Sequence, residues 1–366
     1  MLAVSPKGSR GKQAADNSIE ELAQLAAASG AKVIRKIVQQ LPEPSGSLYV
    51  GKGKLVELAA LRDTMEYTVL ILDDELSPNQ QRNLEEALKV KVIDRAALIL
   101  DIFARRARTH EGRLQVELAQ HQYILPRLAG QWSHLERLGG GIGTRGPGES
   151  QLETDRRMIR RKIQRLQKQA EDIRKQRSLY RRRRQKSGIP VIAIVGYTSA
   201  GKSTLLNALC QAEVLTDNKL FATLDPTTRR LVIPDGRTIL LTDTVGFIRK
   251  LPPTIIDAFR ATLEELDEAS VLVHVVDMAS RDAAEQCQAV EDIIDELELA
   301  EKPRITALNK IDMLLDDSRV WNEQGAIDYL SSRVEGEQEN TVLISAARKW
   351  GLTRLLEMIE KRLDNI

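Results

Sequence analysis

The fold is decided by residues 191–204, which read Val-Ile-Ala-Ile-Val-Gly-Tyr-Thr-Ser-Ala-Gly-Lys-Ser-Thr. The first five residues form an apolar run typical of a buried parallel strand, and a helix is expected over residues 202–210. A glycine-bounded loop between such a strand and such a helix is the context that the pattern G-x-x-x-x-G-K-[ST] requires. The sequence therefore predicts a phosphate-binding loop made of Gly196, Tyr197, Thr198, Ser199, Ala200, Gly201, Lys202, Ser203 and Thr204.

Each part of this loop has its own chemical task. Glycines let the backbone wrap around phosphates, successive N–H groups point inward, and the N-terminus of the helix adds its positive dipole end. Lys202 is expected against the β- and γ-phosphates, and Ser203 is expected to ligate Mg²⁺. The alternative is a glycine turn that precedes a helix by chance, and three motifs further along the chain argue against it.

The second motif follows a predicted hairpin. Strands are expected over residues 231–233 and 238–242, joined by a Pro-Asp-Gly turn. The Asp243 carboxylate can hold Mg²⁺ through water, because Mg²⁺ usually keeps part of its hydration shell. The N–H of Gly246 is expected at the γ-phosphate. We expect nucleotide contacts along the whole motif, which is Asp243, Thr244, Val245 and Gly246.

Two further motifs predict that the base is guanine. The Asp312 carboxylate can accept two parallel N–H bonds from the guanine edge, a donor pair that adenine lacks. Asn309 and the stem of Lys310 would brace this loop and cover the base. A backbone N–H near Ser345 would reach the guanine oxygen. The expected base contacts are Asn309, Lys310, Ile311, Asp312, Ser345, Ala346 and Ala347.

A loop between residues 217 and 230 is expected to respond to the γ-phosphate. Either Thr223 or Thr227 can ligate Mg²⁺ when that phosphate is present, and we favour Thr223 over Thr227. The expected nucleotide contacts in this loop are Phe221, Ala222, Thr223, Leu224 and Asp225.

The residue after Gly246 indicates slow hydrolysis. Many GTPases have a glutamine there that orients the attacking water, whereas this chain has Phe247, which has no hydrogen-bonding group. The residues expected to take part in catalysis are Lys202, Ser203, Thr223, Asp243 and Gly246. A partner, a bound ion or another loop would have to position the water.

Composition fits a soluble globular protein of two or three domains. The chain has 366 residues, of which 42% are hydrophobic and 29% are charged. It shows neither a long uncharged apolar run nor the pattern of a signal peptide, and we expect no integral membrane segment. Cys210 and Cys287 have no metal-ligand spacing, which indicates reduced thiols in a cytoplasmic protein.

The basic charge is concentrated in one stretch. Residues 151–187 contain 15 Lys or Arg and 4 Asp or Glu, a local charge of +11 in a chain whose formal net charge is +2. A basic segment on an acidic body suggests a polyanionic partner, although a solvated helix face is the alternative. Nucleic-acid contact is expected from Arg145, Arg181, Arg182, Arg183 and Arg184.

The pattern predicts an α/β chain in three parts after a disordered start at residues 1–17. A small α/β domain is expected over 18–112, an antiparallel basic helical hairpin over 113–187 with a glycine-rich tip at 139–149, and a P-loop GTPase domain over 188–366. Within the first domain, strands are expected over 32–38, 47–50, 69–72 and 90–93, and helices over 19–28, 53–61 and 79–88.

These motifs together resemble the HflX family, which is grouped with Obg among the translation-factor-related P-loop GTPases. The resemblance runs over nearly the whole chain. It is most specific at four stretches, which are residues 49–54 (Tyr-Val-Gly-Lys-Gly-Lys), 102–107 (Ile-Phe-Ala-Arg-Arg-Ala), 139–149 and 221–227 (Phe-Ala-Thr-Leu-Asp-Pro-Thr).

The resemblance implies binding to the ribosome, chiefly to the 50S subunit and its 23S RNA, and not to DNA. It further implies GTP-dependent splitting of stalled or idle 70S ribosomes, with ribosome-stimulated hydrolysis. We expect a monomer, with peripheral membrane association left open. The family usually has asparagine where this chain has Ser199, and that difference leaves K⁺ binding open. The alternative function is a GTP-controlled switch, or a factor that remodels ribosomal RNA without splitting subunits.

Overall fold

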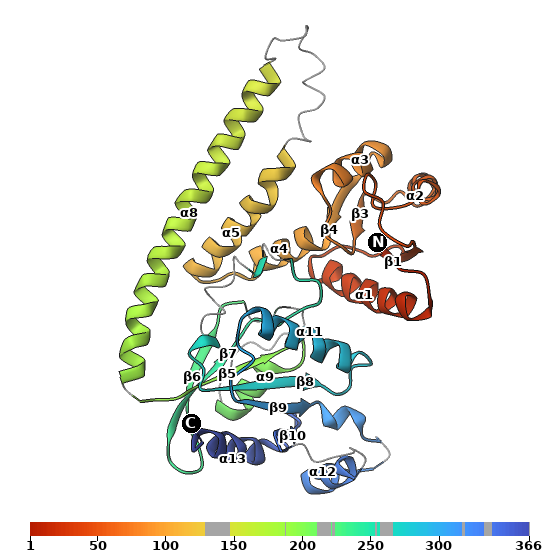
Figure 1. Cartoon of the computed structure of the whole chain (residues 1–366). Helices are drawn as coiled ribbons and strands as arrows, with labels where there is room; N and C mark the ends of the chain where they lie inside the picture. The colour runs from red at the N-terminus through yellow and green to blue at the C-terminus, as the bar shows by residue number, and fades with distance from the viewer. Residues whose placement is uncertain are drawn as a thin grey trace. The chain divides into compact units, whose positions relative to one another are not determined.

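The structure is a computed structural model, and it divides into two compact units (Figure 1). The first unit is Met1–Ile173 with Lys250–Ala258, and the second is Arg174–Arg249 with Phe259–Ile366. The division lies inside one long helix, whereas the sequence pattern placed it after residue 187. The structure describes residues 1–128, 147–186, 188–210, 221, 224–252, 255–256, 266–316, 319–332 and 339–365, without the side chains of 9–10, 147–152 and 178–186.

The first unit contains a four-stranded parallel sheet in the order β2-β1-β3-β4. Its core is apolar and includes Leu2, Leu72 and Leu84. The strands are β1 (Leu2–Ser5), β2 (Ile37–Gln40), β3 (Val69–Leu72) and β4 (Lys91–Asp94), and the helices are α1 (Ser9–Ala28), α2 (Lys52–Met65), α3 (Pro78–Leu88) and α4 (Arg95–Arg106).

Two expectations for this unit are wrong. Residues 1–17 are not disordered, because β1 is an inner strand of the sheet and Leu2 and Ala3 are fully buried. Pairing with β2 and β3 holds a strand of four residues that is too short to show a period of its own. The strand expected over 47–50 is instead a turn, where Ser45 and Tyr49 make an isolated bridge and Tyr49 has a φ of 65°.

A helical hairpin follows this sheet in the chain. Helix α5 (His110–Ile124) ends just before Pro126, which lies in the 3-10 turn η1 (Leu125–Arg127), and α8 spans Pro147–Lys186. Leu114 and Leu118 of α5 pack with Ile163 and Leu166 of α8, as expected for an antiparallel helical hairpin. The expected tip at 139–149 lies outside the described residues, except that α8 begins at Pro147.

The second unit is a six-stranded sheet in the order β10-β9-β8-β5-β7-β6. All neighbours are parallel except the hairpin of β6 and β7, which confirms the predicted hairpin. The strands are β5 (Val191–Gly196), β6 (Thr227–Val232), β7 (Thr238–Asp243), β8 (Val271–Asp277), β9 (Arg304–Asn309) and β10 (Thr341–Leu343).

Helices pack against this sheet and enclose its core. Helix α9 contacts β5, β6 and β7, α11 contacts β5 and β8, and α13 contacts β8 and β9 (Figure 1). All six residues of β5 are buried, as expected for a central parallel strand. The helices are α9 (Lys202–Cys210), α11 (Ala283–Glu296), α12 (Glu323–Ser331) and α13 (Leu352–Leu363), with a 3-10 turn η2 (Ile311–Leu314).

Candidate nucleotide-binding site

The four motifs lie at one edge of the second sheet. The phosphate-binding loop follows β5, the Asp243 motif ends β7, the Asn309 motif ends β9, and Ser345 follows β10. These four strands run in the same direction, so their carboxyl ends meet at this edge. In open α/β sheets, ligands bind outside the carboxyl ends of the strands.

The phosphate-binding loop needs glycine at both ends. Gly196 has a φ of 148°, and a Cβ there would lie 2.3 Å from the carbonyl oxygen of Val275. Gly201 has a φ of 100°, and a Cβ there would lie 2.3 Å from Nδ2 of Asn309. Any side chain at either position would therefore clash with a neighbouring strand or with the Asn309 side chain.

Lys202 is held inside this loop. Its Nζ donates to the carbonyl oxygens of Gly196 over 3.0 Å and of Tyr197 over 2.8 Å, and the residue is only 6% exposed. Burial lowers the pKa of Lys202 to about 8, while the Asp243 carboxylate opposes that shift. A buried cation at the end of a glycine loop is suited to bind an anion such as a phosphate.

The residues expected to hold Mg²⁺ fit that ion. The Ser203 hydroxyl donates to Oδ2 of Asp243 over 2.6 Å, which brings two oxygen ligands together. Mg²⁺ prefers such hard oxygen donors. Thr227 lies opposite Asp243 in the antiparallel pair of β6 and β7, whereas Thr223 lies outside the described residues. The choice between the two threonines therefore stays open.

The segment after Asp243 pairs with the phosphate-binding loop. The N–H of Thr198 donates to the carbonyl oxygen of Phe247 over 2.8 Å, and the N–H of Phe247 donates to that of Gly196 over 3.1 Å. A Cβ on Gly246 would be 3.0 Å from Nζ of Lys202. The expected γ-phosphate contact at Gly246 thus lies beside the Lys202 ammonium group.

One amide side chain connects three of the loops. Asn309 is 2% exposed, and its Nδ2 donates to the carbonyl oxygen of Ala200 over 2.8 Å. Its Oδ1 accepts from the N–H of Ala346 over 3.0 Å. The phosphate-binding loop, the Asn309 motif and the Ser345 motif are therefore fixed relative to one another by hydrogen bonds.

The position of Asp312 suits a ligand contact. Oδ1 of Asp312 is shielded from solvent and has no hydrogen-bond partner among the described residues. Buried polar atoms are almost always hydrogen-bonded, so an orphaned carboxylate oxygen points to a ligand. Its predicted role with guanine stays a prediction.

Sequence reasoning missed Asp277, whose carboxylate pairs with a residue of the base loop. Lys310, which has a φ of 65°, extends its ammonium group to Oδ2 of Asp277 at the end of β8, over 2.7 Å. The available signal was an aspartate directly after the largely apolar run of residues 271–276. Among the remaining predicted contacts, Phe221 and Leu224 are buried and Ala347 is exposed, while Ala222 lies outside the described residues.

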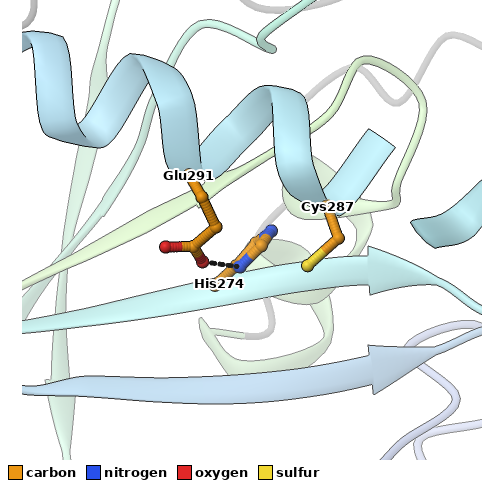
Figure 2. A group of neighbouring side chains, drawn as sticks. All are labelled: His274, Cys287 and Glu291. Carbon is orange, nitrogen blue, oxygen red and sulfur yellow. Dashed lines mark ion pairs between the residues drawn. The ribbon is translucent and has the colours of Figure 1, made fainter. Parts of the chain in front are cut away.

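A second cluster of polar side chains joins β8 to α11 (Figure 2). Ligand atoms of His274, Cys287 and Glu291 all lie within 4.8 Å of one another. One oxygen of Glu291 lies 3.4 Å from Nδ1 of His274, and the other pairs with Arg304. Those two contacts lower the pKa of Glu291 to about 2.

The ion pairs of Glu291 with His274 and Arg304 explain why these side chains lie together. Burial, and then the Glu291 carboxylate, raise the pKa of the Cys287 thiol, which disfavours the thiolate that binds metals. Because both oxygens of Glu291 are already engaged, we assign no metal to this cluster.

The predicted RNA contacts are only partly described. Arg145 lies outside the described residues, and Arg181, Arg182, Arg183 and Arg184 are placed only as part of the backbone of α8. Within the described part of the chain, no helix is long and apolar enough to cross a membrane.

Comparison with known proteins agrees with this site. Three family models match, described as GTP-binding GTPase N-terminal over residues 16–104, GTP-binding GTPase Middle Region over 106–184 and 50S ribosome-binding GTPase over 191–310. GTPase HflX of Caldanaerobacter subterraneus subsp. tengcongensis is 50% identical over 348 residues, which cover 95% of this chain and 77% of that protein.

Two further proteins are similar to this chain to different degrees. GTPase HflX of Escherichia coli (strain K12) is 44% identical over 347 residues, which cover 94% of this chain and 79% of that protein. A solved GTP-binding protein from the archaeon Sulfolobus solfataricus, in complex with GDP, is 27% identical with a TM-score of 0.47, and the match covers 100% of this chain and 99% of that chain.

Proposed function

Since the chain belongs to the HflX family of GTPases, we propose that it binds GTP at the edge of the second sheet and hydrolyses it to GDP and phosphate. The observation that carries this proposal is the pair of hydrogen bonds from Asn309 to the phosphate-binding loop and to Ala346. These bonds hold a phosphate subsite and a base subsite at a fixed separation, as a nucleoside triphosphate requires.

Each group in this site has a role in the proposed reaction. The Lys202 ammonium binds the β- and γ-phosphates, and the N–H of Gly246 contacts the γ-phosphate. Mg²⁺, when bound, neutralises charge on the phosphate oxygens, and it would be held by Ser203, by the threonine at 223 or 227, and by Asp243 through water. The Asp312 carboxylate selects guanine by accepting hydrogen bonds from the two N–H donors on the edge of that base.

The proposed partner of the GTPase is the large ribosomal subunit. One family model that matches this chain is described as a 50S ribosome-binding GTPase, and its match over residues 191–310 includes the phosphate-binding loop, the Asp243 motif and Asn309. The local charge of +11 at residues 151–187 lies almost wholly on α8, which suits contact with 23S RNA. We propose that GTP binding and hydrolysis on the subunit separate 70S ribosomes into their two subunits.

Sedimentation of 70S ribosomes tests this function. Ribosomes are mixed with the protein and with GTP, GDP or a non-hydrolysable GTP analogue, and are then separated on sucrose gradients. We expect free subunits to accumulate with GTP and to remain at background with GDP. The Lys202→Ala variant, which loses a phosphate ligand, should leave the ribosomes intact.

The same samples distinguish the alternative function. A switch or RNA-remodelling factor would sediment with ribosomes in a GTP-dependent way and would leave the 70S peak unchanged. Hydrolysis measured with and without 50S subunits completes the test. We expect hydrolysis to be much faster with subunits, and equal rates would argue against a ribosome-stimulated GTPase.

A further inference from the structure

One buried hydroxyl group in the phosphate-binding loop has no hydrogen-bond partner. Thr198 is 6% exposed, and its Oγ1 makes no hydrogen bond with any described residue. Its backbone is fixed, because its N–H donates to the carbonyl oxygen of Phe247 over 2.8 Å. A buried hydroxyl group without a partner is destabilising in a folded protein, so a ligand atom is expected at this point.

The hydroxyl group lies at the phosphate end of the site. A Cβ built on Gly246 would lie 2.9 Å from Cα and Cγ2 of Thr198 and 3.0 Å from Nζ of Lys202. Thr198 and the Lys202 ammonium group therefore both lie beside Gly246, the residue whose N–H is assigned to the γ-phosphate. The neighbouring hydroxyl, that of Ser199, belongs to an exposed residue.

The residue directly after Gly246 cannot supply the water-orienting group that hydrolysis needs. Phe247 is 2% exposed and has no hydrogen-bonding atom in its side chain, so it cannot orient water. Given the proposed GTP hydrolysis, on which this inference rests, we propose that the hydroxyl group of Thr198 holds the attacking water against the γ-phosphate. It takes the task that a glutamine performs in many GTPases.

The hydroxyl group has the capacity for this task. It has one O–H donor and two acceptor lone pairs, so it can accept a hydrogen bond from the water and donate a hydrogen bond to a γ-phosphate oxygen. The water oxygen then bonds to the γ-phosphorus, the bond to the β–γ bridging oxygen breaks, and GDP leaves with that electron pair. The proton of the water passes to the released phosphate, and Thr198 is unchanged. The branched side chain limits rotation of the hydroxyl group.

Two substitutions at this position test the proposal. Thr198→Val keeps the shape of the side chain and removes the hydroxyl group, while Thr198→Ser keeps the hydroxyl group. Single-turnover GTP hydrolysis is measured for the full chain with and without 50S subunits, together with the affinity for GDP. We expect Thr198→Val to slow hydrolysis on the order of 10- to 100-fold with unchanged GDP affinity. Thr198→Ser should stay within a few fold of the wild type.

A matched control is Thr238→Val, at the opposite end of β7, where the hydroxyl group accepts from Arg230. It should hydrolyse GTP at the wild-type rate. Wild-type hydrolysis in Thr198→Val would overturn the role of Thr198, and so would an equal loss in Thr198→Ser. A wild-type protein that fails to hydrolyse GTP at all would instead refute the proposed function.

Discussion

At the scale of single residues, the buried ammonium group of Lys202 gives the nucleotide site a pH dependence. Burial lowers the pKa of Lys202 to about 8, below its ordinary value of 10.5. Phosphate binding favours the charged form and must raise the pKa again. Between about pH 8 and 10, nucleotide binding should therefore take up a proton.

We expect GDP affinity to fall as the pH rises above about 8, by up to about tenfold per pH unit. Isothermal titration calorimetry at pH 7, 8 and 9, in buffers with different ionisation enthalpies, measures both the affinity and the proton uptake. The Lys202→Gln variant is the control, because it should bind more weakly without this pH dependence. An affinity of the wild type that is constant up to pH 9.5 would contradict the assignment.

Asp312 gives a prediction for base specificity. Its buried Oδ1 has no partner among the described residues, and a charge-assisted hydrogen bond there contributes about 1.5–3 kcal/mol. Asp312→Asn should weaken GDP binding by roughly 10- to 150-fold and shift the preference toward xanthosine diphosphate. Competition between the two diphosphates measures this shift. A variant that keeps its GDP affinity would show that Asp312 does not contact the base.

At the scale of elements, the seam between α5 and α8 is a testable contact. Leu166 of α8 is 5% exposed and packs with Leu114, Leu118 and Ile163. Leu166→Ala should lower the free energy of unfolding of the first unit by about 2–5 kcal/mol, because it leaves a cavity. Chemical denaturation followed by circular dichroism measures this change. Met158→Ala on the same helix, at a residue 58% exposed, is the control and should change little.

Charge on α8 gives a prediction about salt. Replacing Arg181, Arg182, Arg183 and Arg184 by glutamine should weaken 50S binding and flatten its dependence on salt, since each neutralised phosphate releases counterions. Nucleotide affinity should not change. Affinity is measured at several salt concentrations, and a slope equal to that of the wild type would mean that these arginines only solvate a helix face.

The control for this measurement removes the same charge elsewhere. Arg281, Arg319, Arg354 and Lys361 are exposed residues of the second unit outside the four motifs. Their replacement by glutamine should leave the salt slope of 50S binding unchanged.

Elements with a clear apolar pattern could be predicted from the sequence, and elements without such a pattern could not. Residues 69–72 and 202–210 were predicted to the residue as β3 and α9, because each combines an apolar pattern with clear boundaries. The four residues of β1 show no period, and only pairing with β2 and β3 makes them a strand. The motifs predicted the edge of the sheet where the site lies. The ion pair of Lys310 with Asp277 could not be predicted in this way, because it forms only where the ends of β8 and β9 lie side by side.

At the scale of the whole molecule, a buried ionic network holds the first unit together. Arg95 is 1% exposed and pairs with Asp73, which is fully buried, and with Glu21 of α1. Lys250, which this unit includes, also pairs with Asp73. Burial alone would raise the pKa of Asp73, but the charges of Arg95 and Lys250 outweigh burial and lower it.

Asp73→Asn should therefore destabilise the first unit by about 3 kcal/mol, since it leaves the buried Arg95 with only one of its two carboxylate partners. Because the folded-state pKa of Asp73 is lowered, its stabilisation is present above the ordinary value of 3.8 and is lost as the pH falls through the folded-state pKa. Urea unfolding at pH 7 and at about pH 3, which is below that ordinary value, measures both effects. Asp63→Asn, at an exposed carboxylate of the same unit, is the control.

The hydrogen bonds of Asn309 have a consequence for the reaction cycle. They fix the separation of the expected base and phosphate subsites, so nucleotide binding should require little further ordering of these loops. GDP spans the same separation as GTP and should meet the same contacts, except those assigned to the γ-phosphate. GTP and GDP should therefore both remain bound at this site. The residues beside Gly246 and the loop at 217–230, which are expected to respond to the γ-phosphate, would then report which nucleotide is bound.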